Sequence, residues 1–267
     1  MGFLTGKTAI ITGGGRAVLS DGSCGSIGYG IATAYAKEGA NLVLTGRNVQ
    51  KLEDAKAELE SKYGIKVLAV QADVNAGADN ESVVKNVVEQ AVKEFGRIDV
   101  LINNAQASAS GVTIADHTTA QFDLAIYSGL YAAFYYMQAC YPYLKETKGS
   151  VINFASGAGL FGNYGQCAYA AAKEGIRGLT RVAATADNSG KYRRNHTIIR
   201  EEKRGMRRSR FFKALMAWAL VIIMVTANAG DVFTSRALFS FFLIHIMQLP
   251  YMDKCNCYYN SLMHCRL

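Results

Sequence analysis

The chain has 267 residues, of which 50% are apolar, 19% charged and 10% aromatic, and it contains only two prolines. This composition excludes an intrinsically disordered chain and a proline-rich linker, and the length allows one large domain or two small ones. The net charge of +8 belongs to the end of the chain, because residues 1–185 hold 16 basic and 16 acidic residues whereas residues 186–267 hold 13 and 5. The first two thirds therefore give no indication of nucleic-acid binding.

Between residues 7 and 185, short apolar runs alternate with longer amphipathic ones. We expect strands at 8–12, 41–46, 66–70, 99–103 and 150–156, and helices at 28–38, 49–62, 81–95, 118–144 and 168–184. Near-continuous apolar strands separated by helices are typical of βαβ units, so we predict an α/β fold with a Rossmann-type doubly wound parallel sheet. Such sheets bind ligands at the carboxyl ends of their strands.

A glycine-rich turn follows the first strand. Its residues are Thr12, Gly13, Gly14 and Gly15 at the end of the strand and Ser26, Ile27 and Gly28 at the start of the helix. Glycines let the backbone approach a pyrophosphate, and the N-terminus of the following helix meets its charge. This turn predicts dinucleotide binding, and the alternative is an ordinary flexible loop.

The ends of the next strands supply further candidates for contacts with a dinucleotide. Arg47 follows the second strand, where an acidic residue would bind the ribose hydroxyl of NAD and an arginine suits the ribose phosphate of NADP. It therefore favours NADP(H), with Arg16 as a second candidate contact, and the alternative is a solvated surface arginine. The remaining candidates are Asp73 and Val74 after the third strand and Asn103, Asn104 and Ala105 at the end of the fourth.

Ser156, Tyr169 and Lys173 form a candidate catalytic group. Tyr169 and Lys173 are four residues apart on an expected helix, so their side chains share one face. A lysine ammonium near a phenol lowers the pKa of the phenol, which prepares Tyr169 for general acid–base catalysis. Ser156 ends the fifth strand, where its hydroxyl would hold a substrate oxygen.

These motifs, in this order, resemble the short-chain dehydrogenase/reductase family. The landmarks are TGGG followed by SIGYGIA, then NNA, then Ser156 and YAAAK, and within the family segments such as FGRIDVLINNAQASASG and SVINFASGAGLFGN are similar to bacterial 12α-hydroxysteroid dehydrogenases. The resemblance covers residues 1–185. It implies an NADP-dependent enzyme that interconverts a hydroxyl and a ketone on a bile-acid steroid, and a homo-oligomer.

Several positions depart from the family pattern. Residues 17–25 are an insertion of nine residues, Ser26 stands where the middle glycine is usual, and Gln106 replaces the glycine of the NNAG motif. The family also places an asparagine on the helix after the fourth strand. Ser128 and Gly129 occupy that region here, so we assign no catalytic asparagine.

Residues 186–267 resemble no part of the family, and we treat them as a separate, atypical tail. A basic run at 191–210 precedes two apolar runs at 214–227 and 237–249. Such an abrupt change is typical of a frameshifted or fused reading frame. We expect the sheet to lack the last two family strands. The apolar runs are short for a bilayer span, so membrane contact through 211–249 is the less favoured alternative to a core or interfacial helix.

Two further expectations concern surroundings and ligands. The apolar run at the N-terminus is too short for a secretory signal, so we expect a cytoplasmic protein with reduced thiols. Cys255, Cys257 and Cys265 match no zinc spacing, so we expect no metal. Two alternatives to a hydroxysteroid dehydrogenase stay open, namely a reductase of 3-oxoacyl thioesters or other carbonyls and an inactive fragment that only binds the cofactor.

Overall fold

The computed structural model describes residues 2–75, 77–184, 224–225 and 262–266. The strands are β1 (Thr8–Thr12), β2 (Asn41–Gly46), β3 (Val67–Gln71), β4 (Val100–Asn103), β5 (Ser150–Phe154), β6 (Met224–Val225) and β7 (Leu262–Arg266). The helices are α1 (Ile27–Lys37), α2 (Val49–Tyr63), α3 (Asn80–Phe95), α4 (Thr119–Ala125), α5 (Ala132–Thr147), α6 (Gly157–Phe161) and α7 (Cys167–Ala183). Two short turns complete the set, the 3₁₀ turn η1 (Gly77–Asp79) and the π-helical turn η2 (Ile126–Tyr131).

The strands form one sheet in the order β3-β2-β1-β4-β5-β7-β6. All pairings among β1 to β5 are parallel. The chain runs outward from β1 to β3 and then crosses to β4 and β5, so the order reverses between β1 and β4. This is the predicted doubly wound α/β sheet, and a ligand crevice is expected at the reversal point.

The edge of the sheet beyond β5 differs from the expectation of a sheet that lacks its last two strands. Two short strands from the tail continue the sheet here, but β7 runs antiparallel to β5 and β6 pairs with β7. Their direction therefore breaks the parallel pattern of β1 to β5. The basic run, both apolar runs except residues 224 and 225, and Cys255 and Cys257 lie outside the described residues.

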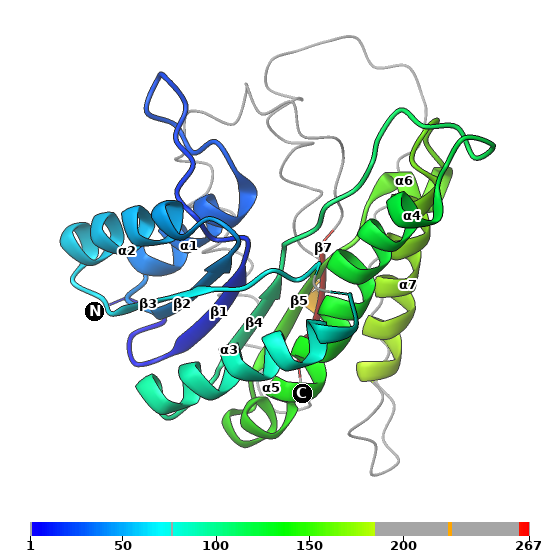
Figure 1. Ribbon diagram of the computed structural model, residues 1–267. Helices are drawn as coiled ribbons and strands as arrows, with labels where there is room; N and C mark the ends of the chain where they lie inside the picture. Colours follow the sequence, from blue (N-terminus) through cyan, green and yellow to red (C-terminus); the bar gives the residue numbers. More distant parts are fainter. Residues whose placement is uncertain (1, 76, 185–223, 226–261, 267) are drawn as a thin grey trace, which may run out of the picture.

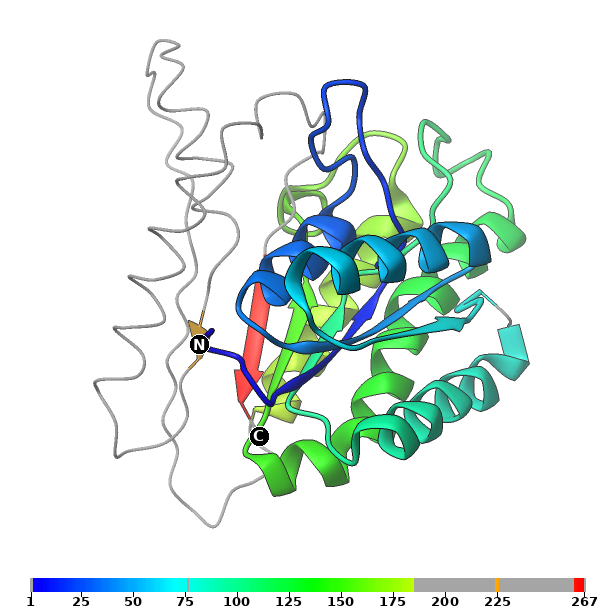
Figure 2. The ribbon, with the colours of Figure 1, turned by 90° about the vertical axis from the view of Figure 1, so that its left-hand side faces the viewer.

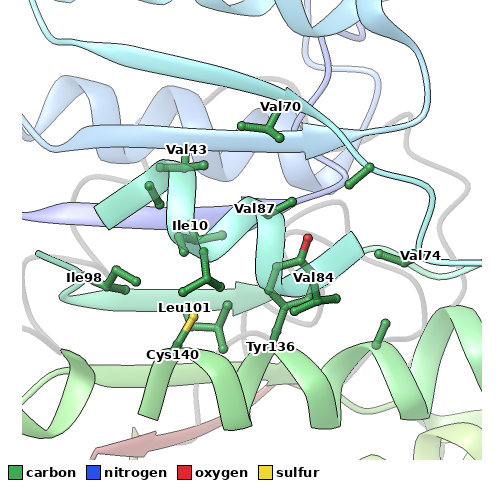
Figure 3. Packing of buried hydrophobic residues seen from close by; sticks show 14 of the residues in the cluster. Ile10, Val43, Val70, Val74, Val84, Val87, Ile98, Leu101, Tyr136 and Cys140 are labelled. Atoms are coloured by element: carbon green, nitrogen blue, oxygen red, sulfur yellow. The ribbon is translucent and has the colours of Figure 1, made fainter. Parts of the chain in front are cut away.

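Two apolar layers enclose the sheet, because successive strand residues point to opposite faces. On one face Ile11 and Leu44 pack against α1 and α2. On the other face Ile10, Val43 and Leu101 pack against α3 and α5, as Figure 3 shows. Figures 1 and 2 show these helix pairs on opposite sides of the strands. Apolar burial from both sides fixes the ends of the strands, where the candidate residues lie.

The helix expected at 118–144 is interrupted. Its middle, η2, is a π-helical turn that separates α4 from α5. The hydroxyl of Ser128 in this turn is buried and donates to the carbonyl oxygen of Leu124 at 2.6 Å. A π-helical turn often marks a functional site. Among the described residues, no helix is long and apolar enough to cross a bilayer.

Candidate active site

The glycine-rich turn joins the ends of three strands. Gly13 has a φ of +72°, a conformation that glycine adopts without strain, and its N–H donates to the carbonyl oxygen of Thr45 on β2 at 2.8 Å. The hydroxyl of Thr12 accepts hydrogen bonds from the N–H groups of Asn104 and Ala105, both at 2.9 Å. Candidates from the first and fourth strands therefore lie side by side.

The N-terminus of α1 begins against this turn. The hydroxyl of Ser26 caps the helix by accepting from the N–H of Tyr29 at 3.3 Å. A Cβ at Gly28 would overlap the carbonyl oxygen of Gly13 and would lie 2.7 Å from Nδ2 of Asn104, so only glycine fits there. The free N–H groups and partial positive charge of a helix N-terminus, next to a bare backbone, fit a dinucleotide pyrophosphate.

The other two glycines of the turn also run close to their neighbours. A Cβ at Gly14 would lie 2.9 Å from Cδ2 of Leu44, and one at Gly15 would lie 3.1 Å from Cβ of Lys51. Both positions therefore sit against β2 and the start of α2. Gly13, Gly14, Gly15 and Gly28 thus stand where the chain runs close to its neighbours, and their contact with a ligand stays a prediction.

The insertion at 17–25 folds into a small hairpin beside the turn. Val18 and Cys24 form an antiparallel bridge, and the N–H of Gly25 donates to the carbonyl oxygen of Ala17 at 2.7 Å. The hairpin, dark blue in Figures 1 and 2, projects at the end of the molecule that carries the loops around α4 and α6. The inserted residues thus fold back on themselves, and Gly13 and Gly28 on either side of them lie next to each other.

Arg47 and Asp73 lie just beyond the carboxyl ends of β2 and β3. Both side chains are exposed, whereas Val74 is buried. They border a cavity of about 300 Å³ lined by Arg47, Gln71, Ala72, Asp73, Val83 and Asn86. The Arg16 side chain is instead paired with Glu58, because its Nε donates to Oε2 of Glu58 at 2.6 Å. Arg47 is therefore the better candidate for contact with a ribose phosphate.

Tyr169 and Lys173 lie on α7, and Ser156 lies two residues beyond the end of β5, which stops at Phe154 rather than at residue 156 as expected. Ser156 is buried and caps α6, its hydroxyl accepting from the N–H of Ala158 at 3.2 Å. The Nζ atom of Lys173 lies 5.4 Å from the centre of the Tyr169 ring and donates to the carbonyl oxygen of Phe154 at 2.8 Å. The bond to β5 thus holds the lysine against the tyrosine, as their spacing predicted.

Lys173 is buried, with 3% of its surface exposed. Burial disfavours the ammonium form and lowers the pKa of the Lys173 side chain to about 7. The side chain therefore changes protonation near neutral pH, in contact with the proposed acid–base group. Its acceptor, the backbone carbonyl of Phe154, is a partner that side-chain motifs do not reveal.

A buried chain of polar side chains ties β4 and β5 to α7. Nδ2 of Asn103 donates to Oδ1 of Asn153 at 2.8 Å, and Nδ2 of Asn153 donates to the hydroxyl of Thr180 at 2.9 Å. Thr180 in turn donates to the carbonyl oxygen of Ile176 at 2.7 Å. Asn103 therefore positions the helix that carries Tyr169, in addition to its predicted place near a cofactor.

Two other features do not extend this site. A cavity of about 560 Å³ at the amino end of β2 is lined by Gly2, Thr5, Gly6, Ala36, Lys37, Gly39, Asn41, Lys62, Tyr63, Gly64 and Ile65. It lies at the opposite end of the strand from the candidate residues. Within the described part of the chain, no group of three or more His, Cys, Asp or Glu side chains could hold a metal ion.

Comparison with known proteins identifies the family. Residues 7–191 match the family model described as short chain dehydrogenase. The chain belongs to the short-chain dehydrogenase family. Over 185 residues it is 70% identical to a 12α-hydroxysteroid dehydrogenase from Clostridium sp., a match that covers 69% of each chain. The rest of this chain lies outside that match.

Two solved structures of oxidoreductases have folds similar to that of this chain. A metagenomic short-chain oxidoreductase in complex with NADP is 30% identical, with a TM-score of 0.60 over 68% of this chain and 76% of that one. A xylitol dehydrogenase bound to NAD⁺ is 28% identical, with a TM-score of 0.60 over 68% of this chain and 65% of that one. Solved structures similar to this chain therefore hold either nicotinamide cofactor.

Proposed function

We propose that this protein is an NADP-dependent oxidoreductase that interconverts a secondary alcohol and a ketone. Its substrate is a hydroxysteroid, and the group that reacts is the 12α-hydroxyl of a bile acid. The 70% identity to a 12α-hydroxysteroid dehydrogenase carries this proposal, and the match to the family model over residues 7–191 includes the whole candidate site. Arg47 supports the choice of NADP, because it stands beside a cavity at the end of β2 where a ribose phosphate would need a cation.

The cofactor residues divide by the part of the dinucleotide that each would hold. Gly13, Gly28 and the N-terminus of α1 would hold the pyrophosphate, and Arg47 and Asp73 would hold the adenosine end. Asn104 and Ala105, bound to Thr12, would border the nicotinamide half. When bound, the reduced nicotinamide supplies the hydride that is added to the carbonyl carbon.

Three side chains carry the acid–base part of the reaction. The hydroxyl of Tyr169 donates its proton to the carbonyl oxygen during reduction and accepts the proton of the alcohol during oxidation. The hydroxyl of Ser156 holds the same substrate oxygen. The Nζ atom of Lys173 lies 5.4 Å from the centre of the Tyr169 ring, so the ammonium form of Lys173 would stabilise the phenolate that remains after proton donation.

The proposal is tested by following NADPH oxidation with the purified chain and a panel of carbonyl compounds. A 12-oxo bile acid should be reduced faster, in kcat/KM, than a 3-oxoacyl thioester or a small ketone. NADPH should be used in preference to NADH. A thioester reduced faster than the steroid would overturn the substrate assignment, and NADPH binding without oxidation by any compound would overturn the enzymatic one.

A further inference from the structure

Gln106 follows the Asn103-Asn104-Ala105 segment, and its side-chain amide is buried without a partner. Both Nε2 and Oε1 are shielded from solvent, and neither makes a hydrogen bond within the described part of the chain. A buried amide without partners has lost its hydration with nothing in return, and such groups are rare in folded proteins. Replacing Gln106 with an apolar side chain of similar size should therefore stabilise the folded chain.

The amide occupies space that Gly129 leaves open. A Cβ at position 129 would lie 2.7 Å from Nε2 and 2.8 Å from Cδ of Gln106, closer than side-chain carbons come to other atoms. Any larger residue at 129 would therefore displace the amide. The long side chain at 106 and the missing side chain at 129 fit each other.

The backbone on both sides of Gln106 is fixed. The N–H of Ala105 donates to the hydroxyl of Thr12 at 2.9 Å, which holds the preceding residue against the glycine-rich turn. The N–H of Ala107 donates to the hydroxyl of Ser128 at 2.9 Å, which holds the following residue against η2. The backbone of Gln106 is therefore held between the turn and η2.

This position belongs to the reaction end of the site. The turn η2 packs against α7, where a Cβ at Gly175 would lie 2.8 Å from Cδ2 of Leu130. Helix α7 carries Tyr169 and Lys173. The unpaired amide thus stands between the turn proposed to hold the cofactor and the turn that supports the acid–base group.

We infer that Gln106 is a ligand-binding residue of this site, whose amide forms hydrogen bonds with a hydroxyl group of a bound molecule. A hydroxyl both donates and accepts, so it satisfies Oε1 and Nε2 together. The inference rests on the proposed function, which supplies two such molecules, namely the cofactor through its ribose and the substrate through its secondary alcohol. Gln106 would then select for a hydroxyl at its position, because an analogue without it leaves the amide unpaired.

The variant Gln106→Leu tests the inference, because it keeps the size of the side chain and removes the amide. The thermal midpoint of the chain without ligand should rise by about 2 °C or more, since an unsatisfied buried group is lost. Ligand binding should weaken about tenfold, as expected for one lost hydrogen-bonded pair. Fluorescence titration with NADPH reports a ribose contact, and an increase in KM for the alcohol with unchanged NADPH affinity reports a substrate contact.

Gly129→Ala is the second variant, since its Cβ pushes the amide away without removing it. It should weaken binding in the natural chain and have no effect in a Gln106→Gly background, where the space is empty. Gly175→Ala is the matched control, because it crowds the same η2 turn from α7 without touching the amide.

The results of these experiments separate a failure of the inference about Gln106 from a failure of the proposed function. A Gln106→Leu chain with natural affinity for both NADPH and the alcohol overturns the inference while the proposed function stands. A lower thermal midpoint in that variant also overturns it, because the amide would then be structural. A natural chain that binds no nicotinamide cofactor removes the proposed function, and the inference falls with it.

Discussion

Lys173 should couple the stability of this protein to pH in a range where few other groups titrate. Burial lowers the pKa of its side chain to about 7 in the folded chain, whereas an unfolded lysine has a pKa of about 10.4. Between these values the unfolded state binds more protons than the folded state, so the free energy of unfolding rises with pH. From pH 7 to pH 9 the gain is about 2 kcal/mol.

Urea denaturation at several pH values between 7 and 9 measures this gain. Lys173→Met removes the titrating group and should flatten the increase, whereas Lys93→Met, at an exposed position on α3, should keep it. Curves of free energy against pH that run parallel for the natural chain and Lys173→Met would refute the reasoning. Lys173 would then be charged in the folded state, and burial would not control its protonation.

Three other substitutions test separate parts of the account. Gly28→Ala places a Cβ against the carbonyl oxygen of Gly13 and should weaken NADPH binding at least tenfold in fluorescence titrations. Gly30→Ala, with 3.8 Å to its nearest neighbour, should not. Arg47→Asp should reverse the preference for NADPH over NADH in the same titrations, and equal binding of both cofactors by both chains would contradict the role of Arg47. Asp99→Asn should cost about 1–3 kcal/mol in urea denaturation at pH 7, because the buried carboxylate accepts four hydrogen bonds, and acidification through the lowered pKa of Asp99 should remove the difference.

The parallel sheet was predictable because its strands are buried on both faces and read as continuous apolar runs. The first two strands begin and end where the sequence predicted, at Thr8–Thr12 and Asn41–Gly46. Helix α6 was not expected, because its five residues are too short to show a period. The interruption at η2 was also missed, since the apolar pattern continues through it while the Ser128 hydroxyl bonds to the backbone.

Spacing alone predicted that Lys173 and Tyr169 share a helix face, which the structure confirms. It did not predict the low pKa of Lys173, because burial depends on β5 and α7 packing together. Arg16 was expected to assist Arg47, and only the fold brings it to Glu58. Gln106 was visible as a departure from a motif, but its unpaired amide and the space at Gly129 are properties of the packed chain.

The rate of NADPH-dependent reduction by Tyr169→Phe tests the central claim most directly, since the change removes one hydroxyl and keeps the ring. With a 12-oxo bile acid as substrate, kcat should fall about 10²–10⁴-fold while NADPH affinity stays the same. Tyr164→Phe, at a position that is 84% exposed, should keep the natural rate. A Tyr169→Phe chain that retains most of the natural rate would show that another group transfers the proton.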